Sequence, residues 1–194
     1  MVTFPPLSPS ASWFSHFLKA YARDGNREEA IKSANALIES PKVFGRYSLI
    51  YPDNEIFSLS VAVEGGGRQL RSFSNIETLS LSEHGNWRKN HLGAIETALG
   101  RKPFFRHFKD HLREIYTDRN LCTLRDFNTA IFQLLFSFLM QDIDPPLLKS
   151  VGTQSPIRER ALEIKENINP QISVIQAIAD MGRESLLGLG VTNQ

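Results

Sequence analysis

The sequence lacks the features on which several classes of protein depend. It has a single cysteine, Cys122, which excludes an internal disulfide and a cysteine-rich zinc site. Its longest apolar stretch, residues 130–140, is too short and too interrupted to span a bilayer, and no basic region precedes an apolar one at its N-terminus. We therefore expect a cytoplasmic protein without a membrane span, in which Cys122 is a small core residue.

An excess of charge of one sign is also missing. The 22 Lys and Arg residues nearly balance the 21 Asp and Glu residues, and the two signs are interleaved along the chain. No strong positive field is available to hold nucleic acid, so a nucleic-acid partner is not expected. The 194 residues, 41% hydrophobic and 22% charged, match an ordinary globular protein. We predict one domain over residues 1–194, with a β-rich part at 43–81, a helical core at 86–141 and a C-terminal helical segment at 145–189.

Motifs of the common enzyme classes are absent as well. Three glycines at 65–67 follow a predicted strand, but no phosphate-loop lysine follows them, so a hairpin turn is the favoured interpretation. Neither a nucleophile elbow nor a recognisable pair of carboxylates is present. His107, His111 and Glu114 have the helical spacing of metal ligands, but the apolar stripe of their helix turns His107 and Glu114 toward solvent. We expect no metal site and no cofactor.

The pattern of apolar residues predicts an α+β fold, with a mainly helical body packed on a small antiparallel sheet. Residues 43–50 and 56–63 are rich in aromatic and β-branched side chains, and the turn residues 52–54 between them indicate a β-hairpin. Residues 75–81 resemble a further strand. Helices are predicted to begin near Ser12, Asn86, Pro103 and Thr123, and the last of these has the form of a capping box. Charged and apolar patterns predict two more helices, from Ser155 to about 167 and from 172 to 182.

Two side chains stand out as candidates for a site. His91 lies on the same predicted helix face as Trp87, where an imidazole could transfer a proton or contact a ligand, although a core histidine bonded to a backbone carbonyl is the more common arrangement. Arg46 lies within a predicted strand with apolar neighbours. It needs an acceptor, which is either an internal carboxylate or an anionic ligand.

The order of these segments resembles the WbqC-like family, in particular the form associated with Bacteroidetes. The resemblance rests on an FPP segment at 4–6, an aromatic pair at 13–14, the arginine strand at 44–50, the stretch LSVAVEGGG at 59–67, the W…H…IE.A….PFF core at 87–105, Tyr116, the block at 124–128 and the segments at 172–175 and 182–184. It covers nearly the whole chain. An α+β fold agrees with it.

Several positions depart from the family pattern. Gly45 stands where an asparagine is usual, Leu92 and Gly93 replace aromatic or basic residues, Leu99 replaces a tyrosine and Gln176 an aspartate. Arg183 replaces a proline, and residues 21–34 resemble an insertion. The chain is therefore identified as a divergent member.

The resemblance implies a role in surface polysaccharide precursor biosynthesis, and its most concrete form is acyl or aminoacyl transfer to a nucleotide-linked amino sugar. By analogy, Arg46 would hold an anionic group, His91 would be the acid or base, Trp87 would pack against the sugar and Asn128 would support that geometry. The partner would be a nucleotide sugar or another anionic small molecule.

The alternative is a degenerate, non-catalytic homologue that acts as an interaction or ligand-binding module. The departures at Leu92, Gly93 and Leu99 favour it, because each removes a polar or aromatic group near the central motif. This alternative predicts a shallow or filled pocket beside His91, an exposed apolar patch between residues 156 and 189, and a homo-oligomer or another protein partner.

Overall fold

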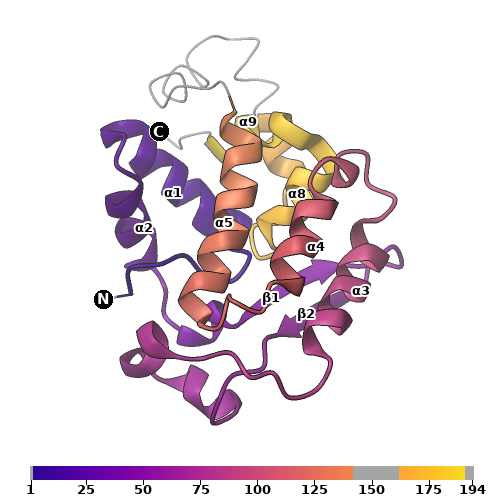
Figure 1. Cartoon of the computed structure of the whole chain (residues 1–194). Helices are drawn as coiled ribbons and strands as arrows, with labels where there is room; N and C mark the ends of the chain where they lie inside the picture. Colours follow the sequence, from indigo (N-terminus) through magenta and orange to yellow (C-terminus); the bar gives the residue numbers. More distant parts are fainter. Residues whose placement is uncertain (1, 142–161, 191–194) are drawn as a thin grey trace.

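A computed structural model describes residues 2–141 and 162–190, and its architecture is α+β (Figure 1). Helix α5 (Leu124–Met140) runs through the middle of the molecule. The other helices around it are α1 (Ala11–Asp24), α2 (Arg27–Asn35), α3 (Trp87–Leu99), α4 (Lys109–Thr117), α8 (Val174–Met181) and α9 (Ser185–Gly190). In Figure 1, α1 and α2 lie on one side of α5 and α3 and α4 on the other. The predicted fold class is confirmed.

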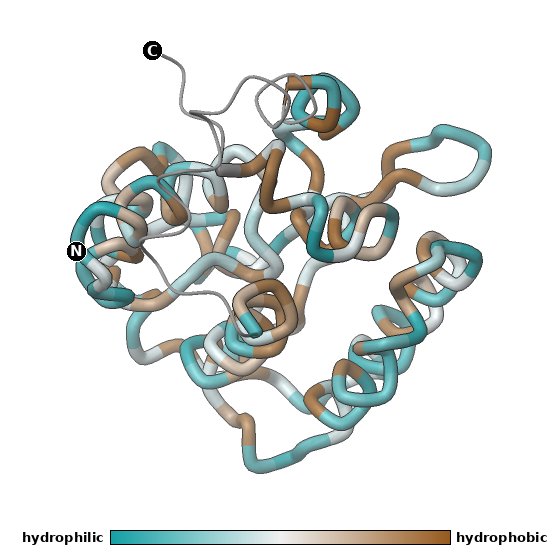
Figure 2. Tube along the Cα trace, turned by 90° about the horizontal axis from the view of Figure 1, so that it is seen from above, coloured by the Kyte–Doolittle hydropathy of each residue, from teal (hydrophilic) through white to brown (hydrophobic). Residues whose placement is uncertain are grey.

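Apolar faces of the helices form the core. Phe17 of α1 packs edge-on against Phe132 and Phe136 of α5, with ring centroids 5.0 and 5.5 Å apart. Such edge-to-face contacts add to the stability gained by burying aromatic surface. Figure 2 shows apolar and polar residues alternating around the helical turns, as expected of helices that bury one face. None of the helices described is long and apolar enough to cross a membrane.

The predicted hairpin is present and shorter than expected. Strands β1 (Arg46–Ile50) and β2 (Ile56–Ser60) pair antiparallel, with Arg46 opposite Ser60 and Ile50 opposite Ile56. Tyr47 and Leu49 are buried toward the helices, whereas Arg46 is exposed. This alternation follows from the two-residue period of a strand. Residues 41–44, assigned in part to the first strand by the sequence, form the 3₁₀ helix η1 (Pro41–Phe44).

The third strand predicted at residues 75–81 is wrong over most of its length. Residues 73–78 form the 3₁₀ helix η3 (Phe73–Thr78), after η2 (Gly67–Arg71). The Ser72 side chain accepts a hydrogen bond from the Ser74 backbone N–H and so caps η3. Only the end of the segment is extended, where Leu81 bridges Val63 and Ser80 bridges Thr123.

Helix starts differ in detail from those predicted. The helix start at Thr123 is confirmed, because its hydroxyl accepts from the Asp126 N–H at 3.1 Å, and the Asp126 carboxylate accepts from the same hydroxyl at 2.7 Å. Helix α1 is capped by Ser10, not Ser12, and the Asn86 side chain makes no capping bond to α3. Pro103 lies in a turn that leads into η4 (Phe105–His107), so α4 begins only at Lys109.

The helices predicted in the C-terminal part of the chain lie only partly within the described residues. Much of the helix predicted from Ser155 lies outside the described residues, although 162–167 are helical. The helix predicted from 172 is confirmed as α8, which ends before Gly182. It is followed by η5 (Gly182–Glu184) and by α9, which the sequence did not predict.

The N-terminal segment is buried without belonging to a sheet. Asn35 donates through Nδ2 to the carbonyl oxygens of Val2 and Phe4, at 3.0 and 2.9 Å, and its Oδ1 accepts from the indole N–H of Trp13. Asn35 is itself buried. One side chain therefore satisfies two carbonyls that have no strand partner.

Asn128 has the same role further along the segment. This fully buried side chain on α5 donates through Nδ2 to the Pro5 and Phe44 carbonyl oxygens, at 3.1 and 2.8 Å. It thereby joins the N-terminal segment to η1, directly before β1.

The starts of α1 and α8 meet next to this segment. Ser10 and Ser173, the residues preceding the two helices, form an antiparallel bridge. The Ala11 N–H donates to the Ile172 carbonyl at 2.9 Å, and the Val174 N–H donates to the Pro9 carbonyl at 2.7 Å. Each helix start is thus satisfied by the backbone that precedes the other.

We predict that Asn128→Ala lowers the free energy of unfolding by about 3 kcal/mol, because it leaves the buried carbonyls of Pro5 and Phe44 without donors. Urea unfolding followed by circular dichroism measures this loss. Asn90→Ala, at an exposed position of α3, is the matched control and should change stability by less than about 0.5 kcal/mol. Equal stability of the two variants would contradict the anchoring role of Asn128.

Candidate functional site

His91 lies on the buried face of α3, with 3% of its surface exposed. Its Nε2 is 3.0 Å from the Ser60 carbonyl oxygen, and its Nδ1 is 3.4 Å from the Tyr116 hydroxyl. A carbonyl can only accept, so Nε2 carries the proton and Nδ1 accepts from Tyr116. Burial lowers the pKa of His91 to about 4, although the bond to Ser60 opposes this shift. The imidazole is therefore neutral at pH 7.

Two tyrosines extend the polar cluster around His91. The Tyr47 and Tyr116 hydroxyl oxygens are 3.1 Å apart, and both residues are buried. Burial raises the pKa of each hydroxyl, so both remain protonated near neutral pH. Since Tyr116 donates to His91, it accepts its own hydrogen bond from Tyr47. The three side chains form a neutral, directed hydrogen-bond network inside the protein.

Trp87 is part of the same packed interior. Its ring contacts that of His91 edge-on, with centroids 5.2 Å apart, and its Nε1 donates to the Ser82 carbonyl at 2.7 Å. Phe127 of α5 covers another part of the indole at 5.5 Å. With 8% of its surface exposed, Trp87 is placed to hold α3 against α5.

Arg46 is exposed, and it shares Ser60 with His91 as a hydrogen-bond partner, although it uses the serine hydroxyl and His91 uses the carbonyl. The Arg46 Nε donates to the Ser60 hydroxyl at 2.9 Å. No carboxylate in the described part of the chain pairs with its guanidinium, so the internal salt bridge that the sequence suggested is not found there. Arg46 therefore keeps unused donors for another acceptor.

The guanidinium lies at a hollow of about 220 Å³ between the N-terminal segment, η1 and β1. The polar and charged residues that line this Arg46 hollow are Ser8, Ser10, Lys42, Arg46, Tyr47, Ser48, Gln171 and Ser173, and the others are mainly apolar. None of the described residues that line it is acidic, and two are cationic. His91 and Trp87 do not line it. Asn128 lies behind it and fixes the carbonyls of Pro5 and Phe44, which adjoin its wall.

Ser8, which lines the Arg46 hollow, has an unusual backbone conformation. It is 3% exposed and has a positive φ of 41°, which a residue with a side chain rarely adopts. Its hydroxyl lies 2.5 Å from that of Ser173, which also donates to the Ser8 carbonyl at 2.9 Å. The two serines fasten the N-terminal segment to the start of α8 and hold this backbone conformation in place.

The comparison with known families agrees with the order of the segments. A family model described as WbqC-like protein family matches residues 39–180. The chain belongs to the WbqC-like family. No match was found among curated proteins or among solved structures. Within this WbqC-like chain, the matched range supplies Lys42, Arg46 and Ser173, whereas Ser8 lies before it.

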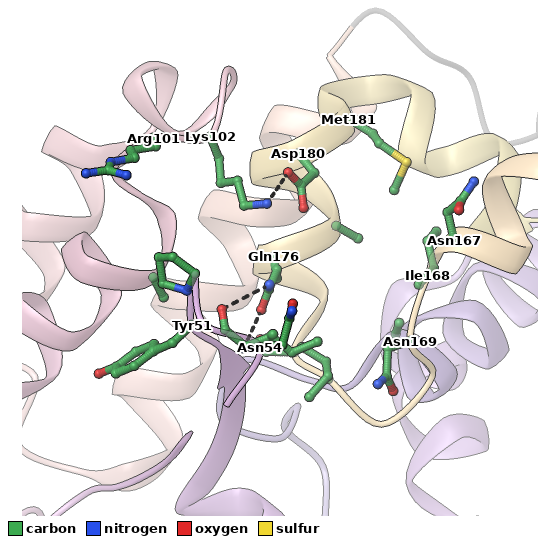
Figure 3. A pocket seen from close by; sticks show the side chains of 17 residues that line it. Tyr51, Asn54, Arg101, Lys102, Asn167, Ile168, Asn169, Gln176, Asp180 and Met181 are labelled. Atoms are coloured by element: carbon green, nitrogen blue, oxygen red, sulfur yellow. Dashed lines mark hydrogen bonds and ion pairs between the residues drawn. The ribbon is translucent and has the colours of Figure 1, made fainter. Parts of the chain in front are cut away.

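A second hollow, of about 440 Å³, separates the β1–β2 turn and the end of α3 from α8 and the residues before it (Figure 3). On its floor, Gln176 accepts from the Ile50 N–H at 2.8 Å and donates to the Ile50 carbonyl at 3.2 Å. An aspartate at this position could accept but not donate. Glutamine therefore matches both polar groups of the strand edge. We call this cavity the α8 hollow.

The residues with the helical spacing of metal ligands do not form a metal site in the described part of the chain. His107 and His111 are exposed, and His111 Nδ1 lies 3.1 Å from a Glu114 carboxylate oxygen. No group of three metal-ligating side chains occurs among residues 2–141 and 162–190.

The expectation that Cys122 is a core residue is wrong. Its side chain is exposed because it lies in the loop before α5, where its thiol donates to the Arg119 carbonyl.

Sequence reasoning missed Lys42, Ser8 and Ser173. Lys42 directly precedes the strand predicted from residue 43, and nothing in that pattern marked it as part of a site. Ser8 and Ser173 were missed because they are 165 residues apart in the sequence. Pro9 gives no signal for the backbone of Ser8, since a following proline favours an extended conformation and Ser8 has a positive φ.

The burial of His91 predicts a specific pH dependence of stability. Its folded-state pKa of about 4 lies below the unfolded value of about 6.5, so the unfolded chain binds a proton more readily. Stability that is present above pH 6.5 is therefore lost as the pH falls toward 4, by about 2 kcal/mol between pH 7 and pH 5.

Urea unfolding at pH 7 and pH 5 measures this loss. His91→Gln is the control, because glutamine can still donate to the Ser60 carbonyl but does not titrate. The pH-dependent loss should be smaller in this variant by about 2 kcal/mol. The same pH dependence in both proteins would show that His91 is not the responsible group.

Proposed function

We propose that this WbqC-like protein binds an anionic precursor of a surface polysaccharide, and that the Arg46 hollow holds the phosphate or carboxylate of that precursor. The observation that carries the proposal is the pair of cations, Lys42 and Arg46, at a hollow whose described lining contains no acid. Two positive charges beside apolar walls attract an anion more strongly than charges in open water do. Arg46 also offers the planar set of donors that suits phosphate and carboxylate oxygens.

The size of the Arg46 hollow limits how much of the precursor it holds. At about 220 Å³ it is smaller than the 300–1,000 Å³ typical of sites that enclose a whole drug-sized ligand. The hollow therefore takes the charged group, and the rest of the molecule extends beyond it. A nucleotide-linked amino sugar, the substrate class that the family resemblance implies, carries such a group in its diphosphate.

The geometry supports binding more directly than catalysis by His91. Both ring nitrogens of His91 are engaged, the imidazole is buried, and neither it nor Trp87 lines the Arg46 hollow. Acyl or aminoacyl transfer with His91 as acid or base would require the imidazole to leave the Ser60 carbonyl. We therefore propose a ligand-binding member of the family, in which His91, Trp87 and Asn128 support the fold around the site.

A protein-interaction role has less support. It predicted an exposed apolar patch between residues 156 and 189, but Leu162 is the only exposed large hydrophobic residue in the described part of that segment. The other exposed apolar side chains are scattered over the N-terminal half and include Leu37, Ile56 and Phe57.

Thermal unfolding with inorganic phosphate and with a UDP-linked amino sugar tests the proposal. A ligand at a hundredfold its dissociation constant adds about 2.7 kcal/mol, which raises the melting temperature by roughly 5–10 °C in a chain of this size. Arg46→Gln and Lys42→Gln should each abolish most of this increase. Arg68→Gln, which removes an exposed arginine that lines neither hollow, is the matched control and should retain it. No response in the wild type, or an equal loss in all three variants, would refute the proposal.

His91→Ala separates a structural from a catalytic role. We expect a loss of about 2–4 kcal/mol of stability, because a cavity and two unpaired partners remain in the interior. The melting temperature should still rise when the UDP-linked amino sugar is added. A stable variant that no longer responds to the ligand would instead place His91 in the site.

A further inference from the structure

The α8 hollow has no part in the proposed anion site and is twice as large as the Arg46 hollow. Figure 3 shows its two walls, with the turn that carries Tyr51 and Asn54 on one side and Asn167 and Asn169 on the other. A volume of about 440 Å³ lies within the range of small-molecule sites.

Three charged residues line the α8 hollow, and two of them, Lys102 and Asp180, neutralise each other; the third is Arg101. Lys102 Nζ lies 2.7 Å from an Asp180 carboxylate oxygen, so the two opposite charges on its wall form an ion pair. Arg101 extends away from this pair in Figure 3. An anion would meet the Asp180 carboxylate, and an apolar ligand would displace water from the remaining oxygen of Asp180 and protons of Lys102 without replacing its hydrogen bonds. The hollow therefore favours a ligand that is polar and uncharged.

Free carboxamide groups line both walls. The Asn54 amide makes no hydrogen bond to any described residue. Asn169 uses its Oδ1 to accept from the Gln171 N–H, and its Nδ2 has no acceptor among the residues that the structure describes. Asn167 uses its Nδ2 to donate to the Glu163 carbonyl, and its Oδ1 has no donor within the same described ranges. Donors and acceptors are thus both available across the cavity.

We propose that the α8 hollow binds a neutral sugar ring. Each hydroxyl of a sugar both donates and accepts, so a ring with several hydroxyls can pair with the amides and with the unused oxygen of Asp180 and protons of Lys102. Recognition of a neutral sugar needs both hydrogen-bond donors and acceptors, and the amides and the ion pair supply both.

The two hollows adjoin each other. Ser173 borders both, and β1 contributes Arg46 and Ser48 to one and Ile50 to the other. The sugar and the anionic group of one precursor would therefore bind side by side. This assignment of the sugar to the precursor rests on the proposed function, whereas binding of a free sugar in the α8 hollow does not depend on the Arg46 hollow.

Saturation-transfer NMR with free glucose, galactose and N-acetylglucosamine tests the proposal on the full chain. We expect transfer to at least one of these sugars, with a dissociation constant of about 1 mM, as is usual for a ligand with so few atoms. The double variant Asn54→Gly and Asn169→Asp removes two free amides and should weaken binding by about tenfold.

Both substitutions preserve the local backbone. Asn54 has a φ of 66°, which glycine adopts readily, and aspartate at 169 keeps the oxygen that accepts from the Gln171 N–H. An unchanged melting temperature of the double variant checks this.

Arg46→Gln is the control from the other hollow, and it should bind the free sugars as the wild type does. Conversely, the double variant should keep its stabilisation by inorganic phosphate, so failure of one site is distinguishable from failure of the other. No transfer to any of the three sugars, or equal transfer in the double variant and the wild type, would overturn the proposal.

Discussion

The fold depends on how the buried N-terminal segment satisfies its backbone. Residues 2–9 are mostly buried and follow an irregular path, and they do not pair along a strand as a sheet would require. Asn35 and Asn128 supply the missing donors, and each reaches two carbonyls. Because unpaired buried carbonyls are costly, these two amides fix the path of the segment. The start of α1, the position of η1 and the wall of the Arg46 hollow all follow from that path.

The candidate binding surface is consequently assembled from parts of the chain that are far apart. The Arg46 hollow takes one wall from the N-terminal segment, one from β1 and one from the residues before α8. Local patterns predicted the hairpin, the helix start at Thr123 and α8, because these depend on turn chemistry, caps and periodicity within a few residues. The contact between Ser8 and Ser173 depends on none of these local features, because the two residues are far apart in the sequence. Arg46 was found because a cation in an apolar strand is conspicuous, but nothing local associated it with Lys42.

His91 illustrates a second limit of the sequence. A histidine one turn after a tryptophan fits an active-site base and a core residue equally well, because both lie on an aromatic helix face. The difference is decided by Ser60 and Tyr116, which come from other elements and engage the two ring nitrogens. The predicted strand at 75–81 failed for a similar reason, since apolar residues in a short segment do not show whether a partner strand is available.

One side chain occupies one end of each edge of the two-stranded sheet. On β1, the Gln176 amide pairs with the N–H and carbonyl of Ile50 as a neighbouring strand would, and on β2 the His91 imidazole donates to the Ser60 carbonyl. An open strand edge is a template on which a second chain can add, and such addition leads to aggregation. Gln176 and His91 thus each block one end of a strand edge to such an addition.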